Sequence, residues 1–142
     1  MDYHDALLAR IEKATGLPAT STIRNNVTAA KSLGIRNIVL ANKWGPDINK
    51  VLGMFFEREG IQIAGINCRS MVPSQFLKLK DGEHLALAYE LGREALANNP
   101  DADGLYLGGS AWLTYPLVKP LEKEFGKPVI VNEMTEVRMS IF

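Results

Sequence analysis

Short apolar runs alternate with longer amphipathic segments along the chain. Four runs are rich in Ile, Val and Leu and lack the polar alternation of a half-exposed strand: residues 35–41, 61–66, 104–107 and 127–131. Such continuous apolar strands are typical of a parallel sheet that is covered on both faces. The pattern therefore predicts four mostly parallel strands inside an α/β domain.

Helical segments separate these runs, and Gly or Pro marks most of their ends. A helix through residue 33 is expected to begin at one of the three hydroxyl residues 20–22, which can act as N-caps. The other predicted helices cover residues 3–14, 46–58, 82–97, 112–125 and 133–142, with a short helical turn at 73–79. The helix at 112–125 requires that Pro116 and Pro120 be tolerated near its first turn or as a kink.

Strands and helices in this alternation predict an open doubly wound, mostly parallel four-stranded sheet with helices on both faces. The 142 residues are enough for one core, and the sequence contains neither a Ser/Gly linker nor an internal repeat. We therefore expect a single domain over residues 1–142.

Charge and composition narrow the classes of partner. Sixteen basic residues balance sixteen acidic ones, so neither nucleic acid nor an anionic membrane is an expected partner. The apolar runs are far shorter than the ~20 residues of a membrane helix, and the acidic N-terminus does not resemble a signal peptide. The lone cysteine cannot form an internal disulfide, and a cytoplasmic protein is the expectation.

The ligand site of a doubly wound sheet lies beyond the carboxyl ends of the strands, where the strand order reverses. In this chain, residues 42–47, 67–71, 108–112 and 132–135 follow the four strands. A carboxylate or phosphate could bind the backbone N–H groups of Gly108, Gly109 and Ser110, aided by a following helix dipole. The alternative is a tight connection in which Ser110 only caps the next helix.

Two further residues near the first strand are candidates for binding a small carboxylate. Lys43 follows the strand and can attract an anion, whereas the alternative is a solvated loop charge. Asn49 lies slightly further on, and its alternative is an amide on a helix surface. His4 and His84 are expected to be exposed on helices without a second ligand nearby, so we predict no metal site.

Three stretches, in order, resemble one half of a known family. They are ATGLPATST at residues 14–22 with LGIRNIVLA at 33–41, NCRS at 67–70, and DADG at 101–104 continuing through LT at 113–114 to GKPVIV at 126–131. Together they resemble the C-terminal lobe of the aspartate/glutamate racemase superfamily, especially arylmalonate decarboxylases and, less closely, maleate cis-trans isomerases. Asn49 matches an asparagine that is common in this family.

The resemblance implies cofactor-independent isomerase or carbon–carbon lyase chemistry at a site between two lobes, with a cysteine thiol as acid or base. Aligned on Leu113 and Thr114, the position of that thiol is Gly109, which has no such group. Trp44 stands where a tyrosine hydroxyl is frequent, and an indole N–H only donates. Cys68 lies in a Cys-Arg-Ser motif that the decarboxylases carry away from the catalytic thiol, and Arg69 is expected to pair with a local carboxylate.

Three hypotheses remain from the sequence. In the first, the chain completes a carboxylate site by pairing with a partner lobe or with its own copy, as a homodimer. In the second, it is a binding or regulatory module without chemistry, which Gly109 and Trp44 favour. The third is a truncated enzyme, because the chain ends within a predicted helix.

Overall fold

The four strands form one parallel sheet in the order β2-β1-β3-β4, in a computed structural model that describes residues 2–109 and 112–140. The strands are β1 (Asn37–Asn42), β2 (Gln62–Cys68), β3 (Gly104–Gly108) and β4 (Val129–Ile130). The predicted α/β class and four-stranded parallel sheet are confirmed.

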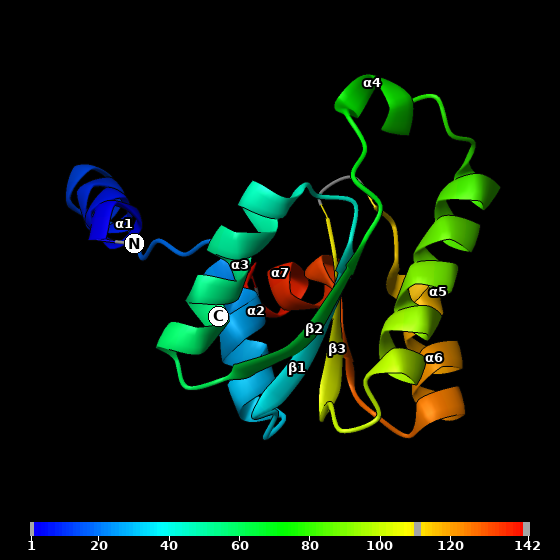
Figure 1. Cartoon of the computed structure of the whole chain (residues 1–142). Helices are drawn as coiled ribbons and strands as arrows, with labels where there is room; N and C mark the ends of the chain where they lie inside the picture. The colour runs from blue at the N-terminus through cyan, green and yellow to red at the C-terminus, as the bar shows by residue number, and fades with distance from the viewer. Residues whose placement is uncertain (1, 110–111, 141–142) are drawn as a thin grey trace.

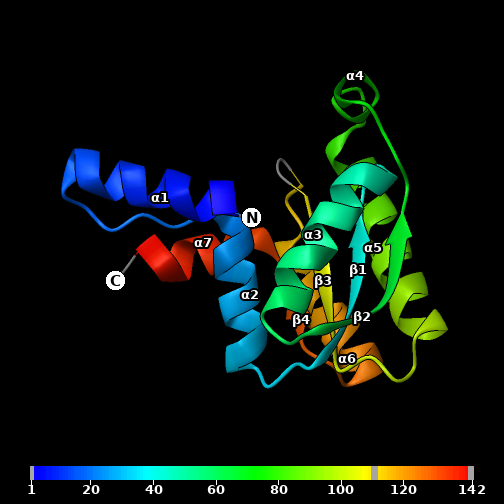
Figure 2. The same cartoon turned by 60° about the vertical axis from the view of Figure 1, so that its left-hand side comes forward.

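Helices cover both faces of this sheet (Figure 1). On one face lie α5 (Asp81–Asn98) and α6 (Val118–Phe125), and on the other α2 (Thr22–Ser32), α3 (Pro46–Arg58) and α7 (Asn132–Ser140). The helix α1 (Asp2–Thr15) projects away from the sheet beside α2 and α7 (Figure 2). No helix in the described ranges combines the length and the apolar character needed to cross a membrane.

Alternate residues of the central strands feed two separate apolar clusters. Val39 and Ala41 pack with the residues of α5 and α6, whereas Ile38 and Leu40 pack with those of α2 and α3. All four side chains are fully buried. Because successive strand residues point to opposite faces, an uninterrupted apolar run fills both layers of the core.

The predicted helix at 112–125 begins later than expected. Residues Tyr115–Leu117 form a 3-10 turn (η1), and α6 follows from Val118. Pro116 has no N–H, and it disfavours helical backbone at the preceding residue. Pro120 is tolerated because it lies in the first turn of α6, whose N–H groups need no partner within the helix.

The other helix and strand boundaries agree with the ranges predicted from the sequence to within a few residues. Ser21 is the N-cap of α2, where its Oγ accepts from the backbone N–H of Arg24 at 3.3 Å. The short turn α4 (Pro73–Phe76) lies in the long connection between β2 and α5. Figure 1 shows α4 at the carboxyl end of the sheet, above β1 and β2.

Candidate functional site

The order in which the chain adds strands to the sheet reverses between β1 and β3. The connection from β1 leads to β2 on one side, and β3 leads to β4 on the other. Asn42 and Gly108 are register partners at the carboxyl ends of β1 and β3. Of the four segments that follow the strands, the structure thus brings the start of 42–47 and the Gly108–Gly109 pair together at the switch point.

Side-chain amides hold the loop after β1 in one conformation. The Asn42 amide donates to Asn49 Oδ1 at 2.7 Å, and Asn42 Oδ1 accepts from the Trp44 backbone N–H at 2.8 Å. Asn49 in turn donates to the Trp44 carbonyl at 3.0 Å. Asn49 is only 3% exposed, so it is not an amide on a helix surface. Its polar atoms support the loop that carries Lys43 and Trp44.

Lys43 is buried at this point, with 5% of its surface exposed. Its Nζ atom lies 3.1 Å from the centroid of the Phe76 ring and 5.6 Å and 5.5 Å from those of Trp44 and Trp112. Aromatic faces attract an ammonium ion through their negative quadrupole. Desolvation by burial lowers the pKa of Lys43 to about 8. The alternative of a solvated loop charge is therefore wrong.

The two glycines at the end of β3 allow close approach to the backbone. A Cβ atom at Gly108 would overlap the ring of Tyr106. Gly109 has a φ of +146°, a value that side-chain-bearing residues rarely adopt. A Cβ there would lie 3.4 Å from Lys43 Cε and 3.7 Å from its Nζ. The Lys43 side chain thus occupies the space beside the bare backbone of Gly109.

The first helical turn described after β3, η1 (Tyr115–Leu117), has a carboxylate at its N-terminus. Glu133 Oε1 accepts from the backbone N–H groups of Thr114 at 2.5 Å and Tyr115 at 3.2 Å. Thr114 is the N-cap of η1. Ser110 itself lies outside the described residues.

The other candidates from the sequence lie at the margins of this site. Cys68 is exposed at the end of β2, and Arg69 lies 3.7 Å from the carboxylate of Glu90, as expected of a local ion pair. His4 and His84 are partly buried rather than exposed. His4 bonds to Ser21 Oγ at 2.8 Å, and His84 to a backbone carbonyl at 3.0 Å. Within the described ranges no His, Cys, Asp and Glu side chains group as metal ligands.

Two aromatic residues at the site were not singled out from the sequence. Phe76 of α4 and Trp112 after β3 are 4% and 2% exposed, and their rings are 6.0 Å apart. The Trp112 indole N–H is buried without a hydrogen-bond partner, so it can donate to a ligand. The signal that could have found them is an aromatic residue in the connection that follows β2 and in the one that follows β3.

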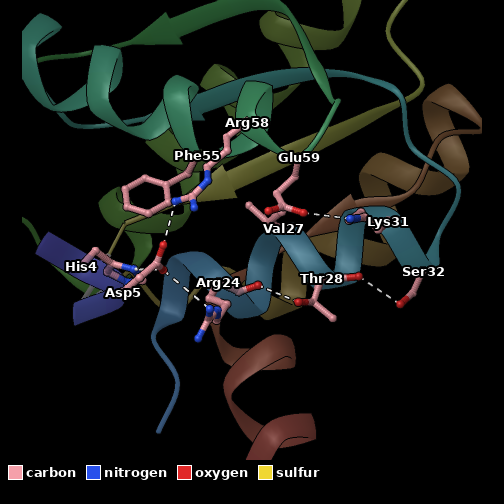
Figure 3. Close-up of a pocket in the computed structure, with 10 residues that line it drawn as sticks. All are labelled: His4, Asp5, Arg24, Val27, Thr28, Lys31, Ser32, Phe55, Arg58 and Glu59. Atoms are coloured by element: carbon pink, nitrogen blue, oxygen red, sulfur yellow. Dashed lines mark hydrogen bonds and ion pairs between the residues drawn. The ribbon is translucent and has the colours of Figure 1, made fainter. Parts of the chain in front are cut away.

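A hollow of about 450 Å³ lies elsewhere, between α1, α2 and α3 (Figure 3). Its charged side chains pair with one another: Asp5 lies 2.8 Å from Arg58 and 3.6 Å from Arg24, and Lys31 lies 2.8 Å from Glu59. Figure 3 shows these pairs bridging the helices that form the walls. The ion pairs of Asp5 therefore help to attach α1 to α2 and α3. The hollow shares no residue with the switch-point site.

Comparison with known proteins places this architecture in a family. A family model described as arylmalonate decarboxylase matches residues 1–138. An arylmalonate decarboxylase from Bordetella bronchiseptica is 28% identical over 128 residues, which are 90% of this chain and 52% of that protein. The chain thus spans about half the length of the curated relative that it matches.

Solved structures of related proteins have the same fold as this chain. A crystal structure of arylmalonate decarboxylase matches with a TM-score of 0.85 and 25% identity, covering 99% of this chain and 60% of that one. The maleate isomerase Iso from Pseudomonas putida S16 shares the fold, with a TM-score of 0.72, 14% identity and coverage of 94% and 54%. These matches confirm the resemblance to the racemase-like superfamily, and the match over residues 1–138 shows that the chain belongs to the arylmalonate decarboxylase family.

Proposed function

We propose that this chain is a decarboxylase-like lobe that binds a small dicarboxylate at the carboxyl ends of β1 and β3. The observation that carries the proposal is the buried ammonium of Lys43 at the switch point, beside the bare backbone of Gly109. An ammonium with a pKa of about 8 is largely charged at neutral pH, so it attracts an anion. The similar proteins are named for arylmalonate and maleate, which are both dicarboxylates.

The residues proposed to surround the ligand come from the two central loops. Lys43 supplies charge, Trp44 supplies an indole N–H, and Gly108 and Gly109 supply backbone that can approach closely. Asn49 acts on the ligand through the loop it holds. Ser110 belongs to the same proposed set by its position in the sequence. The chain has Gly109 where the resemblance expects a cysteine, so any chemistry needs another acid or base.

We further propose that a second lobe completes the site, either as a copy of this chain or as a separate chain. The support is length, since the matched region is 52% of the curated relative and 60% of the solved one. A pseudo-symmetric partner would meet the carboxyl ends of the strands face to face. Light scattering at micromolar concentration tests the homodimer, and a strict monomer would contradict it without affecting carboxylate binding.

Calorimetry tests the binding proposal directly. Phenylmalonate, succinate, maleate and inorganic phosphate are titrated into the protein and into Lys43→Met. We expect a dicarboxylate to bind the protein and to bind Lys43→Met at least about tenfold more weakly, because a charge-assisted contact is lost. Lys123→Met is the matched control, since it removes an exposed charge from the last turn of α6. Equal affinities for the protein and Lys43→Met would disprove the role of Lys43.

The alternative is a regulatory or other non-catalytic module that binds the carboxylate and does no chemistry. Gly109 favours it, because glycine has no acid or nucleophile. Binding without any turnover or proton exchange would be its signature. A silent calorimetric panel would contradict both the binding site and this alternative.

A further inference from the structure

We infer that Lys43 is the acid–base group of this site, moving a proton on and off the α-carbon of the bound dicarboxylate. The inference rests on the proposed function, because it needs a dicarboxylate at the carboxyl ends of β1 and β3. It goes further by giving Lys43 a chemical role in addition to attraction of the anion.

The position of the amine is the first argument. Lys43 Nζ would lie 3.7 Å from a Cβ atom built on Gly109, and Cε would lie 3.4 Å from it. The amine therefore lies beside the backbone of β3 at its carboxyl end, where a ligand at the switch point would lie. A side chain at residue 109 would compete with Lys43 for this space, and glycine leaves it open.

The environment of the amine is the second argument. Proton transfer is most effective when the pKa of the group is close to the working pH, and burial brings the pKa of Lys43 to about 8. Desolvation is the cause of this shift. The aromatic rings of Phe76, Trp44 and Trp112 favour the charged form, whereas desolvation favours the neutral one.

Charged and titratable groups other than Lys43 lie on the elements that surround it. Phe76 also packs against His84 of α5, with ring centroids 4.3 Å apart. Glu133 of α7 is held by Thr114 and Tyr115, beyond Trp112 in the chain. The segment Pro73–Phe76 has no charged residue. We therefore assign the pH dependence near pH 8 to Lys43.

The buried indole of Trp112 supports a ligand at the same place. Its ring centroid is 5.5 Å from Lys43 Nζ, and its N–H has no partner. A carboxylate accepts hydrogen bonds readily and would satisfy this donor. Phe76, which the connection between β2 and α5 carries, covers Lys43.

The proposed step conserves atoms and charge. The neutral amine of Lys43 takes the α-hydrogen as a proton, the C–H bond breaks, and its electron pair forms an enediolate with the adjacent carboxylate. In the reverse direction the Lys43 ammonium protonates that carbon. The same protonation follows if a carboxylate leaves as CO2, and the amine then regains its proton from water.

Hydrogen–deuterium exchange tests this step without requiring decarboxylation. Phenylmalonate is incubated with the full chain in D2O, and deuterium at the α-carbon is followed by NMR against a buffer-only control. We expect exchange that rises with pH through about 8, as the amine loses its proton. Lys43→Arg should bind the dicarboxylate but exchange it about a hundredfold more slowly, because a guanidinium does not give up its proton near neutral pH.

The variants separate this inference from the binding proposal. Binding by the unaltered chain without exchange, or exchange that persists in Lys43→Arg, would overturn the acid–base role and leave the carboxylate site intact. If the unaltered chain neither binds the dicarboxylate nor exchanges its α-hydrogen, both proposals are overturned. An NMR titration of the Lys43 side chain adds an independent check, since a pKa near the ordinary 10.5 would also contradict the inference.

Discussion

The Nζ atom of Lys43 lies 3.1 Å from the centroid of the Phe76 ring, and both side chains are at least 95% buried. The lysine follows β1, whereas the phenylalanine belongs to α4, between β2 and α5. A buried charge loses hydration, and the aromatic face replaces only part of it. Burial of the amine lowers the pKa of Lys43 even though the ring favours the charged form, so the titration of Lys43 reports on its burial.

Stability should depend on pH through Lys43. Its pKa is about 8 in the folded state and about 10.5 in the unfolded chain, so the unfolded state binds more protons between these values. Stability therefore rises with pH in this window. Relative to Lys43→Met, the protein should gain on the order of 1–3 kcal/mol between pH 7.5 and 10.5.

Denaturant unfolding at several pH values measures this difference. Titrations that the two proteins share cancel when their free energies of unfolding are subtracted. Lys123→Met serves as control, since its exposed ammonium should produce no such slope. A constant difference between the protein and Lys43→Met would show that Lys43 is not desolvated.

Substitution of Gly109 should be costly for backbone reasons. Gly109→Ala places a side chain at a φ of +146°, which costs on the order of 1–3 kcal/mol of stability. Gly82→Ala is the matched control, because a Cβ at Gly82 in α5 meets nothing within 4 Å. That control should be neutral or slightly stabilising, since alanine favours helix. Thermal unfolding of both variants decides, and equal midpoints would show that residue 109 is not strained.

A buried polar network at the start of α7 should also be sensitive. Thr135 Oγ1 donates to Asn26 Oδ1 at 2.7 Å, and the Asn26 amide donates to Asn132 at 3.0 Å. Thr135→Val leaves the Asn26 oxygen without that donor and should cost about 1–3 kcal/mol. Thr28→Val removes an exposed hydroxyl from the same helix as Asn26 and should change stability by less than about 0.5 kcal/mol. Chemical denaturation compares them, and equal costs would contradict this role of the network.

The attachment of α1 should weaken in acid. Hydrogen bonds from Arg58 and then His4 hold the pKa of Asp5 below its usual 3.8. Because the folded pKa is the lower one, the stabilising effect is present above about 3.8 and is lost as the pH falls through the folded value. Asp5→Asn should produce the loss at neutral pH, seen as faster amide hydrogen exchange in α1. Glu57→Gln, an exposed change on α3, should leave α1 unaffected.

The core of the fold could be predicted because it depends on local periodicity. The run at 35–41 predicted a strand, and β1 forms at Asn37–Asn42 with both faces buried. The helix at 46–58 was predicted from Pro46 and Gly60 and is found with those bounds. The predicted start of the helix at 112–125 was wrong, because the effect of a proline depends on where the first helical turn begins.

The candidate site could be predicted in part. The rule for strand ends selected the segments with Lys43 and Gly109, and the register of Asn42 with Gly108 brings them together. The burial of Lys43 and the internal carboxylate of Glu133 could not be predicted from spacing. Both depend on side chains that approach from distant parts of the chain.

The sequence by itself determined the order of strands and helices, and that position 109 has no side chain, because periodicity and residue identity are local properties. Only the tertiary structure decided what surrounds Lys43, because α4 and the loop after β3 bring Phe76 and Trp112 over it. Desolvation depends on this three-dimensional surrounding, so the low pKa of Lys43 is a property of the folded chain.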